Sequence, residues 1–166
     1  MANKTTITAE PNKQELYIIR EFEAPRELVF KAYTDPELYA QWVGPNDLTM
    51  TVEKMDAFGG GSYRFLHERD GHVYAFHGVY HEVLTPSRII GTFEFDGLPE
   101  TGHVILGTTK FEDLGNGRSR IVHQSVFQSV SDRDGMVQSG MERGVTQGYD
   151  KLDLLLTSLQ NQDPGT

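Results

Sequence analysis

Residues 61–95 read GSYRFLHERDGHVYAFHGVYHEVLTPSRIIGTFEF, and this stretch decides the fold. Its apolar and polar side chains alternate, which is typical of β-strands with one buried face. We place three strands in it, at 61–68, 73–84 and 88–95. Asp70-Gly71 and Thr85-Pro86-Ser87 separate these strands and have the composition of short turns. Strands joined by such turns form an antiparallel meander.

The same pattern continues on both sides of this stretch. We predict further strands at 16–22, 48–56, 103–113 and 118–127. After the first strand, Pro25 opens a helix, and Asp35 caps a second, short helix that Gly44-Pro45 ends. A long helix from Ser131 to about Gln160 follows the last strand, because apolar residues recur there three and four apart, namely Met141, Val145, Tyr149, Leu152, Leu156 and Leu159. These elements predict an α+β fold.

Length and composition fit one folded domain. The chain has 166 residues and no cysteine, which excludes disulfides and thiolate metal sites. Its net charge of −9 disfavours nucleic acids as partners, and it has no apolar run long enough for membrane insertion and no secretory signal. We therefore expect a cytoplasmic protein, either a monomer or a homodimer. We expect one domain over 1–166, ordered from about 14 to 160, with loose tails at 1–10 and 161–166.

The turns fix which side chains share a face of the sheet. A two-residue first turn pairs Phe65 with Phe76, and a four-residue loop over 85–88 pairs Phe93 with Tyr80. Together these registers gather six aromatic side chains on one face, namely Tyr63, Phe65, Phe76, Tyr80, Phe93 and Phe95. Two interpretations follow. The rings either fill an ordinary core beneath the C-terminal helix or line a cavity between that helix and a curved sheet.

Glycines in the C-terminal helix bear on this choice. Gly140, Gly144 and Gly148 recur every four residues and so lie along one stripe. Each glycine inside a helix costs roughly 0.5–1 kcal/mol relative to alanine. Three on one side indicate a close approach of the helix backbone to the sheet, room for a bound molecule, or fraying near the start of the helix.

The last predicted hairpin contributes two polar residues that are candidates for ligand binding. A two-residue turn at Asn116-Gly117 pairs Phe111 with Val122 and Thr109 with Gln124. If the second pair is buried, its polar groups either satisfy each other or orient the polar end of a ligand.

Few residues suggest catalysis or metal binding. Strict alternation puts Glu82 on the aromatic face, where burial would raise its pKa and make it a candidate general acid. His77 and His81 are four apart, but in a strand this spacing covers about 13 Å, too far for two ligands of one metal ion. We expect no metal site, and no motif for a cofactor is present.

Several stretches resemble the START-like (SRPBCC) superfamily and, within it, the family named for the activator of heat-shock protein 90 ATPase. They are Ala24–Pro36 (APRELVFKAYTDP), Gln41–Pro45 (QWVGP), Gly60–Phe65 (GGSYRF), Phe76–Val83 (FHGVYHEV) and Gly140–Val145 (GMERGV). The resemblance covers about residues 14–160. It implies a helix-grip fold, in which a curved antiparallel sheet wraps a long C-terminal helix with a cavity between them. Relatives often carry a histidine late in the last strand, where we align Gln124.

The superfamily includes proteins that bind lipids, sterols, polyketides and other apolar molecules, and some cyclases and hydrolases. We therefore expect this chain to bind a small apolar or aromatic molecule between the sheet and the C-terminal helix. The alternatives are an enzyme of the cyclase, aromatase or hydrolase type that uses Glu82, and a module that interacts with a chaperone or a regulator. The predicted ligand-binding residues are Trp42, Tyr63, Phe65, Phe76, Tyr80, Phe93, Phe95, Thr109, Phe111, Val122, Gln124, Met141 and Val145.

Overall fold

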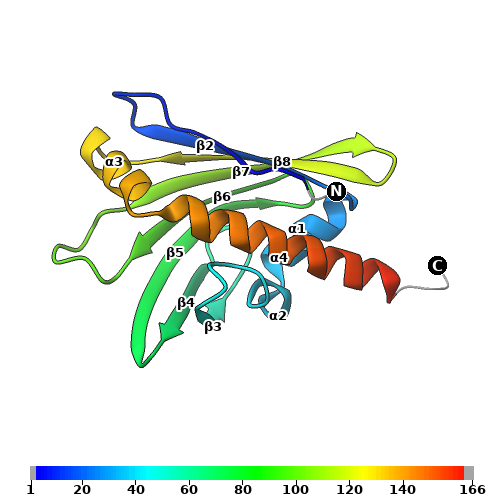
Figure 1. Ribbon diagram of the computed structural model, residues 1–166, viewed down its shortest axis with the longest axis horizontal. Helices are drawn as coiled ribbons and strands as arrows, with labels where there is room; N and C mark the ends of the chain where they lie inside the picture. The colour runs from blue at the N-terminus through cyan, green and yellow to red at the C-terminus, as the bar shows by residue number, and fades with distance from the viewer. Residues whose placement is uncertain (1–2, 163–166) are drawn as a thin grey trace.

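The strands form one antiparallel sheet in the computed structural model, which describes residues 3–162 (Figure 1). The strand order is β1-β2-β8-β7-β6-β5-β4-β3. The strands are β1 (Thr6–Thr8), β2 (Glu15–Phe22), β3 (Thr49–Met55), β4 (Ser62–Arg69), β5 (His72–Leu84), β6 (Arg88–Phe95), β7 (Ile105–Gly115) and β8 (Arg118–Val126). The predicted positions of the seven longer strands are confirmed to within about two residues.

Four helices lie among the described residues. They are α1 (Arg26–Thr34), α2 (Pro36–Tyr39), α3 (Val130–Gln138) and α4 (Met141–Asn161). The orange-to-red α4 crosses one face of the sheet in Figure 1. We call this covered side, which carries the buried residues Leu16, Ile18, Arg20 and Phe22 of β2, the inner face, and the opposite side the outer face. The predicted α+β architecture is confirmed.

The two short helices form where the sequence indicates. Asp35 separates them, and its carboxylate accepts hydrogen bonds from the main-chain N–H groups of Glu37 (2.9 Å) and Leu38 (3.4 Å). These bonds satisfy donors that the first turn of a helix leaves free. The second helix ends at Tyr39, earlier than the predicted end at Gly44-Pro45.

The N-terminal arm is more ordered than predicted. Thr6–Thr8 pair with β2 as a short edge strand, and Ile7 packs against the core. The prediction of a loose arm through residue 10 is therefore wrong at this strand. Residues 1–2 and 163–166, which belong to the predicted tails, lie outside the described residues.

The predicted long final helix is two helices. Ser129 caps α3 by accepting a hydrogen bond from the main-chain N–H of Asp132, so this helix begins before the predicted Ser131. The break falls at Ser139-Gly140, where Gly140 adopts a left-handed conformation with φ of 84°. Glycine adopts this conformation without the steric penalty of a side chain. The apolar stripe that predicts the long helix begins at Met141, after the break, and so does not extend into α3.

The registers of the sheet agree with the prediction in one hairpin and differ in two. Phe65 pairs with Phe76, as predicted. The connection between β5 and β6 is one residue shorter than predicted, and a bulge between Tyr80 and Glu82 shifts the register by one more. The two shifts together keep the aromatic side chains on the same face, because side-chain direction alternates with a period of two. Phe95 therefore pairs with Phe76.

The β7–β8 register is shifted by a single residue, so side chains predicted on one face lie on the other. The predicted turn at Asn116-Gly117 is present, but a bulge between Asp113 and Gly115 moves every later pair by one residue. Phe111 pairs with Ile121, and Thr109 pairs with His123. The predicted pairing of Phe111 with Val122 and of Thr109 with Gln124 is wrong.

The main core lies where α1 and α4 meet β2, β7 and β8. Its buried side chains are Leu16, Ile18, Phe22, Ala24, Val29, Phe30, Ala32, Trp42, Phe111, Ile121, Phe127, Tyr149, Leu152 and Leu156. Arg20 is buried among them and donates hydrogen bonds to Asp150 and Asp153 of α4. This ion-pair cluster and the apolar stripe of α4 hold the helix on the inner face.

Candidate functional site

The six predicted aromatic side chains lie together on the inner face of β4, β5 and β6. We call them the aromatic cluster: Tyr63, Phe65, Phe76, Tyr80, Phe93 and Phe95. Phe76 is central, with ring centroids 5.1 Å from Phe65, 5.3 Å from Phe93 and 5.1 Å from Phe95. Separations of this size are favourable for offset-stacked and tilted aromatic pairs.

The aromatic cluster is distinct from the main core. Phe65 and Tyr80 are buried, whereas the other four rings are only half-buried although they lie on the inner face. Tyr39 of α2 connects the two regions, since its ring centroid lies 5.9 Å from that of Phe65 and 5.7 Å from that of Trp42. The half-buried rings are thus apolar surface that the described helices leave partly accessible.

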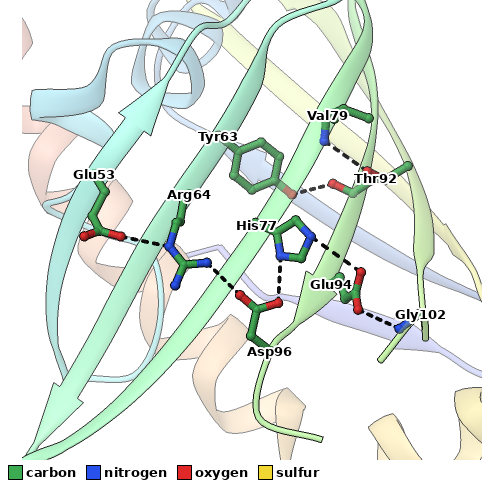
Figure 2. Close-up of polar contacts among 9 residues, drawn as sticks. All are labelled: Glu53, Tyr63, Arg64, His77, Val79, Thr92, Glu94, Asp96 and Gly102. Carbon is green, nitrogen blue, oxygen red and sulfur yellow. Dashed lines mark hydrogen bonds and ion pairs between the residues drawn. The ribbon is translucent and has the colours of Figure 1, made fainter. Parts of the chain in front are cut away.

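Within the aromatic cluster, a tyrosine side chain of β4 donates a hydrogen bond to the main chain of β6 (Figure 2). The Tyr63 hydroxyl donates to the main-chain carbonyl of Thr92 at 2.5 Å, and the hydroxyl of Thr92 accepts from the N–H of Val79 at 3.0 Å. Gly78 makes this possible, because a Cβ there would lie 1.9 Å from the Thr92 carbonyl oxygen and 2.6 Å from the Tyr63 hydroxyl. The arrangement fixes Tyr63 across β5.

Four other predicted ligand-binding residues belong to the main core or pack against it. Trp42 is buried, stacks on Tyr149 at 5.8 Å, and donates its indole N–H to the carbonyl of Ala32. Phe111 is buried with Phe30 and Tyr33, and Met141 and Val145 of α4 pack on the same core. Trp42 and Phe111 are thus embedded in core contacts.

Val122 and Gln124 lie on the outer face. Gln124 pairs with Tyr17 and donates a hydrogen bond to its hydroxyl at 3.0 Å, and Val122 pairs with the exposed Ile19. Their placement on the aromatic face is therefore wrong, and the cause is the bulge in β7.

His123 takes the inner position that the sequence analysis assigned to Gln124. Its Nδ1 lies 2.7 Å from the Thr109 hydroxyl and its Nε2 lies 2.9 Å from the Ser125 hydroxyl. We call these three residues the polar trio. Burial lowers the pKa of His123 to about 4, so the imidazole is neutral at pH 7.

Sequence reasoning missed His123 and Ser125. The signal that could have found them is the sequence Asp113-Leu114-Gly115, since a glycine just before a turn is a common site for a bulge. A bulge there shifts the register by one and brings His123 opposite Thr109.

Glu82 does not face the aromatic cluster. The bulge in β5 puts it opposite Ile90, while its neighbour Val83 pairs with Ile89, and this second pair packs on the core. The carboxylate instead accepts a hydrogen bond from Arg88 at 2.6 Å, which lowers its pKa. The prediction of a buried general acid with a raised pKa is therefore wrong.

A second histidine, His67, borders the aromatic cluster. Its ring lies 5.3 Å from the rings of both Phe65 and Phe76 and packs against Gly44, where a Cβ would come within 2.6 Å of Cε1. Burial lowers the pKa of His67, and its Nε2 has no hydrogen-bond partner among the described residues. His67 is therefore a close-packed neutral side chain.

Charged side chains occupy the outer face of the same strands (Figure 2). Arg64 donates hydrogen bonds to Glu53 (2.9 Å) and Asp96 (2.7 Å), and Asp96 also lies 2.7 Å from His77. Glu94 accepts a hydrogen bond from the main-chain N–H of Gly102. This side of the meander is therefore a charged, solvent-facing surface, and its network holds Asp96 and Gly102 of the β6–β7 loop.

The glycine stripe of the C-terminal region faces the connection after α2. A Cβ at Gly148 would lie 3.0 Å from the carbonyl oxygen of Trp42, and one at Gly144 would lie 3.4 Å from Pro45 Cδ. At Gly148 the helix backbone therefore approaches another backbone closely, but it is that of the connection after α2 and not, as predicted, that of the sheet. Gly140 has a different role, as the left-handed residue before α4.

Other classes of site are not seen in residues 3–162. No group of three or more histidine, aspartate or glutamate side chains there is placed to hold a metal ion. None of the helices in this part of the chain combines the length and apolar character that crossing a membrane requires. A surface groove lies away from the aromatic cluster and is lined by Pro25, Glu27, Leu28, Lys31, Leu159 and Gln160.

The architecture is that of the START-like proteins, with a large antiparallel sheet and a long C-terminal helix. Residues 23–157 match the model of a family described as Activator of Hsp90 ATPase homolog 1-like protein, and the chain belongs to this family. A search of curated protein sequences gives no match.

Solved structures from several bacteria share the fold. A protein from Arthrobacter aurescens has 22% sequence identity and a TM-score of 0.83, over 92% of this chain and 91% of that one. A protein from Rhodobacter sphaeroides has 23% identity and a TM-score of 0.82, over 92% and 99% of the two chains. A protein from Staphylococcus epidermidis has 27% identity and a TM-score of 0.79, over 91% and 94%. The fold of this family is commonly a scaffold for ligand binding.

Proposed function

We propose that the chain binds a small apolar or aromatic molecule on the inner face, between the aromatic cluster and α4. The observation that carries this proposal is the partial exposure of Tyr63, Phe76, Phe93 and Phe95 on the face that the helices cover. An exposed apolar surface is unfavourable in water, by roughly 25 cal/mol for each Å². A ligand that covered these rings would remove that cost, and stacking would add to its affinity.

The cluster also sets the kind of ligand that fits. Its rings come from three neighbouring strands and are joined by contacts of 5.1–5.3 Å around Phe76. Flat aromatic molecules gain most from such a surface because they can stack on several rings at once. The acidic chain, with a net charge of −9, disfavours anions as ligands.

Binding of a neutral aromatic probe tests this function. We expect naphthalene, titrated into the protein by calorimetry or followed by amide chemical shifts, to bind and to shift the signals of β4–β6. Phe76→Leu should weaken binding roughly tenfold, because it removes the central stacking surface while keeping an apolar side chain. Val79→Ala, on the exposed outer face of the same strand, is the matched control and should leave binding unchanged. No binding of naphthalene, or equal binding by the Phe76 variant, would contradict the proposal.

Binding to a chaperone or regulator is supported less well. Such a role would favour a contiguous exposed apolar patch. The most exposed large apolar side chains among the described residues are Phe58, in the β3–β4 connection, and Leu154, on α4. They belong to separate elements, so we rank this function below ligand binding.

A further inference from the structure

The polar trio lies on the same inner face as the aromatic cluster, across the middle of the sheet. One row of paired residues connects the two regions: Tyr80 pairs with Gly91, Gly91 with Gly107, and Gly107 with Ser125. Neighbouring strands are about 4.8 Å apart, so Ser125 lies about 14 Å from Tyr80 along this row. The aromatic cluster and the polar trio are thus at two ends of one strip of sheet.

The middle of this strip carries no side chains, because both of its central residues are glycines. A Cβ at Gly91 would lie 2.8 Å from the carbonyl oxygen of Val79, so the bulged β5 leaves no space for it. A Cβ at Gly107 would lie 3.1 Å from Cε1 of His123, and the imidazole takes that space. Neither glycine has a positive φ, so close packing explains them. The strip therefore carries no side chain over Gly91, and the imidazole of His123 covers it at Gly107.

The trio itself is uncharged at neutral pH. His123 is neutral, and its two ring nitrogens are occupied by Thr109 and Ser125. Ser125 keeps hydrogen-bonding capacity in either tautomer of His123. Its O–H is free to donate if the imidazole donates to it, and its oxygen is free to accept if it donates to the imidazole. Ser125 is also half-buried, whereas Thr109 is buried, so Ser125 is the more accessible hydroxyl.

The charged side chain of β2 on the inner face is already paired. Arg20 of β2 is buried, and its guanidinium donates to Asp150 and Asp153 of α4. A charged ligand at the trio would lose its hydration without gaining an opposite charge, which is unfavourable. A neutral hydroxyl or carbonyl group loses much less and gains a hydrogen bond.

We infer that the ligand is a neutral fused-ring aromatic molecule with a hydroxyl or carbonyl group at one end, its rings stacked on Phe93 and its polar group hydrogen-bonded to Ser125. This inference rests on the proposed function and adds the ligand's polarity, charge and orientation. Phe93 lies two strand spacings across the sheet and two residues along it from Ser125, about 12 Å away, which suits a fused-ring skeleton with a polar group at its end.

Three naphthalene compounds distinguish the elements of this inference: naphthalene, 2-naphthol and 2-naphthoate, titrated by calorimetry at pH 7. We expect 2-naphthol to bind roughly tenfold more tightly than naphthalene, and 2-naphthoate to bind more weakly than either. Ser125→Ala should reduce the affinity for 2-naphthol to about that of naphthalene and leave naphthalene binding unchanged. Gln124→Ala, on the outer face of the same strand, is the matched control and should change neither.

A measurement on the unaltered protein keeps the test independent of folding of the variants. The ¹⁵N signals of the His123 ring should shift on addition of 2-naphthol and stay in place with naphthalene. Equal affinities for naphthalene and 2-naphthol, with no effect of Ser125→Ala, would overturn the inference but leave the proposed function standing. Tightest binding of 2-naphthoate would overturn the assignment of a neutral ligand. Failure of all three compounds to bind would refute the proposed function itself.

Discussion

Tyr63 in β4 reaches across β5 and donates a hydrogen bond to the carbonyl oxygen of Thr92 in β6, 2.5 Å away. The bond spans an intervening strand, and it is possible only because Gly78 has no side chain. It couples the aromatic cluster to the main chain of the sheet. This contact holds Tyr63 in the position from which its ring faces Tyr80 at 5.3 Å.

Tyr63→Phe should therefore lower the free energy of unfolding by about 1–2 kcal/mol, because it leaves the half-buried Thr92 carbonyl without this partner. Urea unfolding followed by circular dichroism would measure the change. Tyr17→Phe is a matched control, since its hydroxyl is on the exposed outer face, and it should cost less than about 0.5 kcal/mol. Similar effects of the two substitutions would count against the role given to Tyr63.

Gly144 and Gly148 should respond in opposite ways to alanine. In Gly144→Ala the new methyl group makes only ordinary contact with Pro45, so the gain in helix propensity, up to about 1 kcal/mol, should raise stability. In Gly148→Ala the methyl group meets the main chain of Trp42 at 3.0 Å and of Gly44 at 3.3 Å, so stability should fall. Thermal unfolding of both variants gives the comparison. An increase in melting temperature for both would show that the α4 packing is looser than described.

Replacing Arg20 should lower the free energy of unfolding more than replacing its exposed partner Asp150. Arg20→Met removes a fully buried guanidinium and leaves Asp153, whose side chain is 24% exposed, without its counter-charge. The loss of a buried partner typically costs about 3–5 kcal/mol. Asp150→Asn is the control, because that side chain is 56% exposed, and it should cost less than about 1 kcal/mol. Equal urea midpoints for the two variants would contradict this ranking.

Stability should fall as the pH is lowered from about 6.5 towards 4. The pKa of His123 is lowered by burial from 6.5 to about 4, and that of His67 is also lowered. Between these values the unfolded chain binds more protons than the folded one, so acid favours unfolding. The His123 shift corresponds to a loss on the order of 3 kcal/mol.

His103 has the opposite dependence. Its hydrogen bond to Asp132 at 2.9 Å raises its pKa, so its contribution is complete below about 6.5 and is lost as the pH rises through the higher folded value. Urea unfolding at pH 7, 6 and 5 would separate the two effects. His123→Gln should flatten the decrease below pH 6.5, whereas His103→Gln should leave it in place. An unchanged slope in the His123 variant would show that this histidine is not the group responsible.

The sequence predicts most of the fold because alternation and turn residues are local signals. The strands of the meander and the position of the Asp35 cap follow from such patterns directly. The bulge at His81 does not, because the extra residue leaves no local signal and is fixed only by pairing with the next strand, and the bulge at Leu114 has Gly115 as its single local signal. In β5 the bulge and the shorter loop together shift the register by two residues, which leaves side-chain direction unchanged, so the aromatic cluster is predicted on the correct face. In β7 a single bulge has no compensation, and His123 replaces Gln124.

The short β1 covers the main-chain edge of β2. Its three residues pair with Tyr17, Ile18 and Ile19, of which the first and last are exposed on the outer face. Without this strand, the main-chain groups of an apolar segment would be open to pairing with a strand of another molecule, the usual route to edge-to-edge aggregation. Removal of the first nine residues should thus promote self-association through the uncovered edge of β2, and it also removes Ile7 from the core that it packs against.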